Sequence, residues 1–72
     1  MKLEYDPDVD AAYLRLRSAA VVSTEEIAPG VLMDVADDGR PVGFEVLDAS
    51  DVLDGRPQGV TFELVSRALN RR

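Results

Sequence analysis

The sequence contains no cysteine, no histidine and no tryptophan. Without cysteine the fold has no disulfide, and without cysteine or histidine the chain lacks the usual ligands of a structural zinc site. The same absences remove nucleophile and base pairs that depend on those residues. No apolar run approaches the roughly 18 residues of a membrane span, and no stretch resembles a signal peptide. We therefore expect a cytoplasmic protein with no membrane association.

The chain is also short, because 72 residues lie near the lower limit for one hydrophobic core. A domain of this size buries only about 60% of the surface that its unfolded chain exposes. Small domains gain stability from disulfides, metals or oligomerisation, and the absence of cysteine and histidine disfavours the first two. The sequence therefore predicts one domain, residues 1–72, that forms a homo-oligomer, most simply a dimer.

The net charge of −6 is distributed unevenly along the chain. Residues 1–54 hold 13 acidic and 4 basic residues, whereas residues 55–72 hold 1 acidic and 4 basic residues. The acidic body repels phosphate, which disfavours nucleic acid, and it attracts a basic protein partner. Arg67, Arg71 and Arg72 leave DNA-binding autoregulation through the basic tail as an alternative, although arginines also suit the end of a helix.

Alternating apolar residues and turn residues predict five strands, at 2–5, 12–17, 21–27, 31–35 and 41–47. Asp6-Pro7-Asp8 is expected to form a turn, and Asp38-Gly39 is expected to join the last two strands as a hairpin. An alternative interpretation makes Asp6 the N-cap of a helix over 7–17. Gly43, inside the last strand, is expected to accommodate a neighbouring aromatic ring.

Two helices are predicted after the strands. Asp48 or Ser50 is expected to cap a short helix that Gly55 ends. Phe62, Val65 and Leu69 recur at helical spacing, which predicts an amphipathic helix over about 61–70 that packs on the sheet or on a second subunit.

The predicted fold class is therefore α+β: an antiparallel β-meander of four to five strands, followed by a short helix and a C-terminal amphipathic helix. The sheet part is expected to span residues 2–53. The predicted core consists of apolar side chains from all these elements: Leu3, Tyr5, Leu14, Leu16, Ile27, Leu32, Val35, Val42, Phe44, Val46, Leu53, Phe62, Val65 and Leu69.

Several segments resemble a known family. They are Tyr5-Asp6-Pro7, Asp10-Ala11-Ala12-Tyr13-Leu14, Ile27-Ala28-Pro29-Gly30-Val31, Gly39, and Val42-Gly43-Phe44-Glu45-Val46-Leu47-Asp48-Ala49-Ser50. Over residues 2 to about 53 the chain resembles the bacterial domain of unknown function 2283 family, which has no established activity or catalytic residues. The resemblance implies a compact domain of sheet and helix. Some relatives are encoded beside small toxin-like proteins, which implies an antitoxin-like or partner-binding role.

No metal or cofactor is predicted. Asp6, Asp8 and Asp10 begin like a calcium loop, but Ala11 stands where the loop needs glycine and Arg17 stands where it needs glutamate. Instead, we expect Asp6 to close a turn through its carboxylate and the other two aspartates to be solvated.

The function predicted is that of a protein-interaction module, and not of an enzyme, because the chain has no histidine or cysteine to act with Ser50 and its one lysine, Lys2, lies in the first strand. Phe62, Val65, Leu69 and Arg67 make the C-terminal helix a candidate interaction element. A polar cluster of Glu45, Asp48 and Ser50 leaves a ligand-binding or weakly catalytic site between subunits as an alternative.

Overall fold

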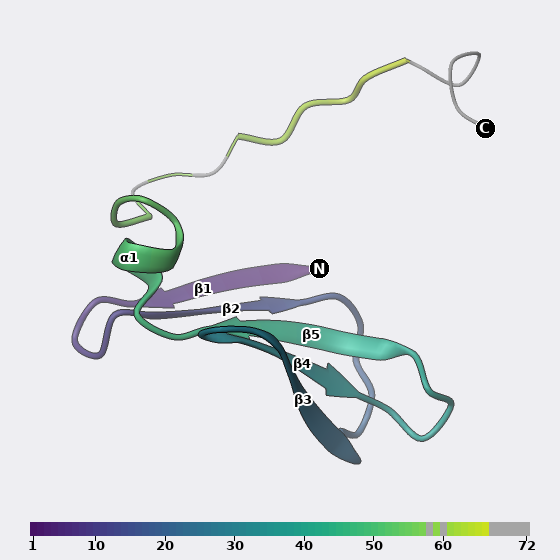
Figure 1. Ribbon diagram of the computed structural model, residues 1–72. Coiled ribbons are helices and arrows are strands. Elements are labelled where there is room, and N and C mark those ends of the chain that lie inside the picture. The colour runs from purple at the N-terminus through teal and green to yellow at the C-terminus, as the bar shows by residue number, and fades with distance from the viewer. Residues whose placement is uncertain (58, 60, 67–72) are drawn as a thin grey trace.

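The chain builds one antiparallel sheet of five strands with a single turn of helix at one end (Figure 1). The computed structural model describes residues 1–57, 59 and 61–66. Its elements are β1 (Lys2–Asp6), β2 (Ala11–Arg15), β3 (Ser23–Ala28), β4 (Val31–Val35), β5 (Pro41–Val46) and α1 (Ala49–Val52). The five predicted strands are confirmed in position, and most ends agree within two residues.

The order of the strands across the sheet is β1-β2-β5-β4-β3, so the predicted simple meander is wrong. β5 lies between β2 and β4, and residues 16–22 carry the chain from β2 to β3 at the far edge. The physical reason lies in polarity. β3 (STEEIA) is mostly polar and suits an edge, whereas β5 (PVGFEV) is mostly apolar, holds the fully buried Val42 and suits the interior.

The turn between β1 and β2 settles the interpretation of residues 6–17. Asp6 Oδ1 accepts a hydrogen bond of 2.9 Å from the Asp8 backbone N–H, which is the predicted turn. Asp10 then takes a left-handed conformation with φ 54° immediately before β2. The alternative helix over 7–17 is therefore wrong.

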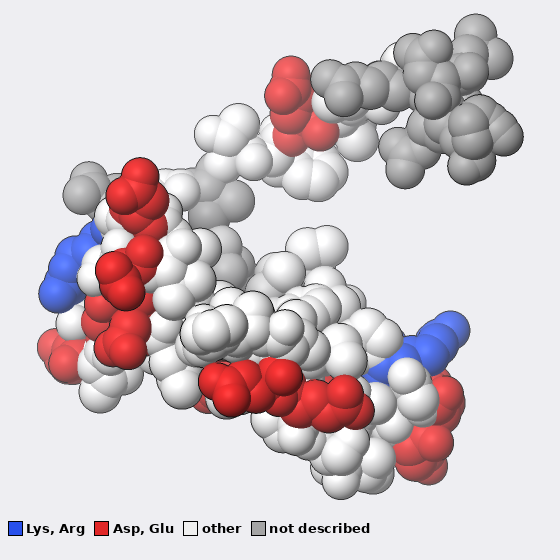
Figure 2. All heavy atoms as spheres, viewed as in Figure 1, with Lys and Arg blue, Asp and Glu red and all other residues white. Residues whose placement is uncertain are grey.

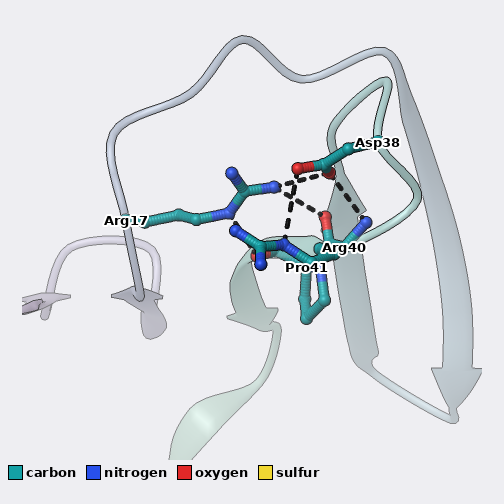
Figure 3. A network of polar contacts seen from close by, with 4 residues as sticks. All are labelled: Arg17, Asp38, Arg40 and Pro41. Carbon is teal, nitrogen blue, oxygen red and sulfur yellow. Dashed lines mark hydrogen bonds and ion pairs between the residues drawn. The ribbon is translucent and has the colours of Figure 1, made fainter.

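The predicted hairpin between β4 and β5 is confirmed, with Gly39 at φ 81°. Asp38 organises it by accepting the Arg40 N–H at 3.0 Å and pairing with the Arg17 guanidinium at 2.8 Å (Figure 3). The Arg40 N–H, followed by Arg17, holds the pKa of the Asp38 carboxyl below its ordinary value. Arg17 also donates to the Pro41 carbonyl, so this hairpin fixes the start of the segment that leaves β2.

The short helix α1 is confirmed, and so is Asp48 as its N-cap, but the cap lacks the expected side-chain bond. Asp48 is the N-cap at φ 50° and makes no side-chain capping bond. The C-terminal helix is not supported: residues 61–66 have no regular secondary structure, Phe62 is 82% exposed, and residues 67–70 lie outside the described residues. No helix in the described part of the chain is long and apolar enough to cross a membrane.

The strand register gives the sheet two chemically different faces. Residues directly opposite each other on paired strands share a face. The first, here called the apolar face, carries the rows Leu3-Leu14-Phe44-Met33 and Tyr5-Ala12-Val46-Val31. The second, here called the polar face, carries the rows Glu4-Tyr13-Glu45-Leu32-Glu26 and Lys2-Arg15-Gly43-Asp34-Thr24.

The buried core is much smaller than predicted. Among the described residues only small side chains are buried, namely Ala12, Val35, Ala36, Val42 and Ala49. Of the predicted core, Leu3, Ile27 and Leu53 are 46%, 51% and 50% exposed, and Phe62 and Val65 are also exposed. The reason is that the described elements form one sheet, with most of their contacts between neighbouring strands, and only the single turn of α1 as a helix against it.

Candidate functional site

The predicted polar cluster is divided between two places in the structure. Glu45 lies on the polar face opposite Tyr13. Asp48 is exposed at the start of α1. Ser50, on α1, is hydrogen-bonded to Asp10 in the turn between β1 and β2. The polar side chains therefore form two separate sites, one around Asp10 and one around Tyr13.

Asp10 fastens the helix to the sheet. Its carboxylate accepts hydrogen bonds from the Tyr5 hydroxyl at 2.6 Å, the Ser50 hydroxyl at 2.5 Å and the Ser50 backbone N–H at 3.1 Å. Its carbonyl accepts the Ala49 N–H at 2.8 Å. The expectation that Asp10 is solvated is wrong, because α1 folds back onto the turn and places these donors around the carboxylate.

The chemistry of this cluster is structural. The hydrogen bonds from Ser50 and then from Tyr5 hold the pKa of the Asp10 carboxyl below its ordinary value. The bond to Asp10 raises the pKa of the Tyr5 hydroxyl, which keeps it protonated as a donor. A carboxylate with a lowered pKa is a poor base for the Ser50 hydroxyl, and these hydrogen bonds hold α1 on the turn between β1 and β2.

The Asp10 carboxylate predicts a loss of stability in acid. Its lowered pKa means that the folded state favours the ionised form, so its stabilisation is present above the ordinary value of 3.8 and is lost as the pH falls through the folded value. Asp10→Asn should lower the thermal midpoint by a few degrees at pH 7, and the difference from the wild type should shrink towards pH 3. Thermal unfolding followed by circular dichroism measures both midpoints.

Asp37→Asn, on the exposed hairpin, is the matched control and should leave the midpoint nearly unchanged at every pH. A constant difference between wild type and Asp10→Asn from pH 7 to pH 3 would contradict the role given to the carboxylate.

The polar face is organised by Tyr13, whose ring crosses β5. Its hydroxyl donates to Asp34 Oδ2 on β4 at 3.0 Å, and the Thr24 hydroxyl on β3 donates to Asp34 Oδ1 at 2.7 Å. The Arg15 guanidinium lies 5.3 Å from the centroid of the Tyr13 ring. These contacts connect β2, β4 and β3 through side chains alone.

Gly43 makes this crossing possible. A Cβ at this position would lie 2.5 Å from the Tyr13 hydroxyl oxygen and 2.6 Å from the Leu14 carbonyl oxygen. The prediction that Gly43 accommodates an aromatic ring is confirmed, and the ring is that of Tyr13. Burial of the ring, followed by the bond to Asp34, raises the pKa of the Tyr13 hydroxyl, so it remains a proton donor.

An open hollow of about 510 Å³ lies beside Tyr13. Its lining combines the carboxylate residues Glu4, Asp6 and Glu45 with Pro7 and Val9. Sites for small ligands and side chains are typically about 300 to 1,000 Å³ and mix apolar walls with a few polar groups. Lys2 pairs with Glu4 at 3.2 Å, but both side chains are well exposed, so this pair adds little.

The acidic character extends beyond the hollow. In Figure 2, acidic side chains gather near α1, along β3 and at the hairpin between β4 and β5, with few basic side chains in view. Within the described part of the chain, no group of three or more Asp, Glu, His or Cys side chains is arranged to hold a metal ion. The acidic residues Glu4, Asp6 and Glu45 give the hollow a negative charge.

The candidate interaction helix contributes little to either site. Phe62 and Val65 are exposed in an extended segment, and Leu69 and Arg67 lie outside the described residues. Sequence analysis missed the roles of Asp10, Tyr13 and Asp34. The available signal was Gly43 within an apolar strand, which implied a ring but did not identify it.

Comparison with known proteins gives one match. A family model described as "Protein of unknown function (DUF2283)" matches residues 2–50. No curated protein and no solved structure matches the chain. The matched segment runs from β1 to the first turn of α1, so it contains the Asp10 cluster, the Tyr13 network and the hollow.

Proposed function

The chain belongs to the DUF2283 family of proteins of unknown function, and we propose that it is a protein-interaction module that binds a basic partner on its polar face. The observation that carries the proposal is the hollow beside Tyr13, where three acidic residues line a partly apolar depression. This combination suits a lysine or arginine side chain better than a neutral ligand.

The chemistry of a long basic side chain matches both parts of the lining. Its hydrocarbon stem can lie against Pro7 and Val9, while the charged end reaches the carboxylates of Glu4 and Glu45. Hydrogen bonds between an arginine and a carboxylate are about twice as strong as those between neutral groups. Arg15 already lies over the Tyr13 ring, which shows that a guanidinium group fits against this surface.

The charge of the whole body supports the same partner class. Residues 1–54 carry a net charge of −9, from 13 acidic and 4 basic residues. A field of this sign accelerates encounter with basic surfaces and repels acidic ones. An antitoxin-like pairing with a small basic toxin falls within this proposal. Catalysis is not part of it, because the Ser50 hydroxyl faces a carboxylate with a lowered pKa.

A fluorescently labelled hexa-arginine peptide provides a test without an identified partner. At 150 mM salt, Glu45→Gln should raise the Kd of the peptide about fivefold, because an exposed charged contact is worth up to about 1 kcal/mol. Fluorescence anisotropy measures the Kd.

Glu25→Gln is the matched control, since it removes the same charge from the exposed edge strand β3. Glu25 lies opposite Met33 and therefore on the apolar face, away from the hollow. Its Kd should change less than about twofold. Equal increases in Kd for the two variants would mean that peptide binding depends on net charge alone, and the proposal would fail.

A further inference from the structure

The two edges of the sheet differ in how regular they are. β1 and β3 are the edge strands, and among the described strands each pairs with one neighbour (Figure 1). The ladder of β3 shifts its register between Glu26 and Ala28, and such irregularities are one device that keeps an edge strand from pairing further. β1 keeps an unbroken register over its five residues. β1 is therefore the edge that is better suited to a further strand.

The backbone groups on the free side of β1 belong to Leu3 and Tyr5. Leu16, directly after β2, donates its N–H to a carbonyl of β5 at 2.7 Å. Successive residues of a strand direct their backbone groups to opposite sides, so Tyr13 directs its groups to β1, where it lies opposite Glu4. Glu4 is therefore bonded to β2, and the N–H and C=O groups of its neighbours Leu3 and Tyr5 point away from the sheet.

The hollow beside Tyr13 reaches this edge, because Glu4, Tyr5 and Asp6 of β1 belong to its lining. Residues directly opposite each other on paired strands share a face, so a strand added to β1 places side chains beside Glu4 and Asp6 on the polar face. Neighbouring strands lie about 4.8 Å apart, which is within reach of a long basic side chain. The side chains in between lie on the apolar face, beside Tyr5 and the 46% exposed Leu3.

We propose that the basic partner binds by adding to β1 a strand in which basic and apolar residues alternate. This inference rests on the proposed function, because the basic side chains of the added strand are those that enter the hollow. In the antiparallel orientation, which is slightly more stable per residue, basic residues lie opposite Asp6 and Glu4. Apolar residues lie opposite Tyr5 and Leu3. Backbone hydrogen bonds then supply affinity and the alternating side chains supply specificity, as at other sheet edges that bind an extended peptide.

Amide hydrogen exchange of the ¹⁵N-labelled full chain tests this mode of binding. In the free chain the Leu3 and Tyr5 amides should exchange quickly and the Glu4 amide slowly, because Glu4 is bonded to β2. A saturating hexapeptide in which arginine and valine alternate should slow exchange at Leu3 and Tyr5 at least about tenfold. A control peptide with three arginines followed by three valines has the same composition and charge, and its Kd should be at least about fivefold higher.

Leu3→Pro removes the outward N–H and leaves the bonds between β1 and β2 in place, since proline is tolerated in an edge strand where the N–H faces solvent. Relative to Leu3→Ala, which keeps the N–H, it should raise the Kd of the alternating peptide about fivefold, because one backbone hydrogen bond is lost. Fluorescence anisotropy measures the Kd, and circular dichroism checks that both variants retain their strands.

The outcomes separate this inference from the proposed function. Binding of the alternating peptide without slower exchange at Leu3 and Tyr5, or equal Kd values for the two hexapeptides, would overturn strand addition and leave the proposed function standing. So would a chain that binds hexa-arginine but not the alternating peptide. If no basic peptide binds, both fail together. Should Leu3→Pro unfold, exchange at Leu3 and Tyr5 in the wild type decides alone.

Discussion

Gly43→Ala is expected to lower the free energy of unfolding by about 3 kcal/mol. The added methyl group would lie 2.5 Å from the Tyr13 hydroxyl oxygen and 2.6 Å from the Leu14 carbonyl oxygen. A side chain can move aside, but the Leu14 carbonyl belongs to the neighbouring strand β2, which pairs with β5. Relief therefore requires separation of two interior strands. Urea unfolding followed by circular dichroism measures the effect.

Gly59→Ala is the control for this substitution, since a Cβ there meets no atom within 4 Å. Its unfolding midpoint should stay close to that of the wild type. The double variant Tyr13→Ala/Gly43→Ala should recover only part of the lost stability, because the contact with the Leu14 carbonyl remains. Full recovery in the double variant would contradict the contact with the Leu14 carbonyl, and equal midpoints for the two single glycine variants would contradict the close packing of Tyr13 and β2 against Gly43.

Val42→Asp is expected to have a still larger effect and to leave the chain unfolded at room temperature. Val42 is the largest fully buried side chain, at 0% exposure. An unpaired charge in such a position costs several kcal/mol. A domain of this length has a total stability of only about 4 to 11 kcal/mol. Far-ultraviolet circular dichroism should therefore show the loss of the sheet.

Val22→Asp makes the same chemical change at a side chain that is 61% exposed, in the segment before β3. Its free energy of unfolding should lie within about 0.5 kcal/mol of that of the wild type. A folded Val42→Asp variant would mean that the small core is not where the structure places it.

Local patterns predicted the strands well, because alternation and turn residues act over a few neighbouring positions. The Asp38-Gly39 hairpin and the Asp6 turn depend only on residues within reach of each other. The order of the strands across the sheet depends on more than neighbouring residues. Placing β5 between β2 and β4 depends on which strand is most deeply buried, and the turn residues do not indicate this.

Contacts across long sequence separations explain the rest of what sequence analysis missed. Tyr13 and Asp34 are 21 residues apart, and Asp10 and Ser50 are 40 residues apart. The Glu45, Asp48 and Ser50 cluster looked continuous in sequence, but strand alternation and the turn into α1 divide it.

The helical spacing of Phe62 and Val65 was an insufficient basis for the predicted C-terminal helix. Helices shorter than about 12 to 15 residues are marginal in water unless an apolar face packs on a partner. In the described residues of this segment the apolar side chains are exposed, and residues 61–66 are not helical.

Recognition of a basic partner by the polar face around Tyr13 can be tested by a nuclear magnetic resonance titration. The ¹⁵N-labelled chain is titrated with hexa-arginine peptide at 150 mM salt, and backbone amide shifts are mapped on the sheet. Saturating shifts are expected to concentrate at Glu4, Tyr13 and Glu45. Shifts spread equally over all acidic segments, including Asp37 and Asp51 outside the hollow, would contradict it.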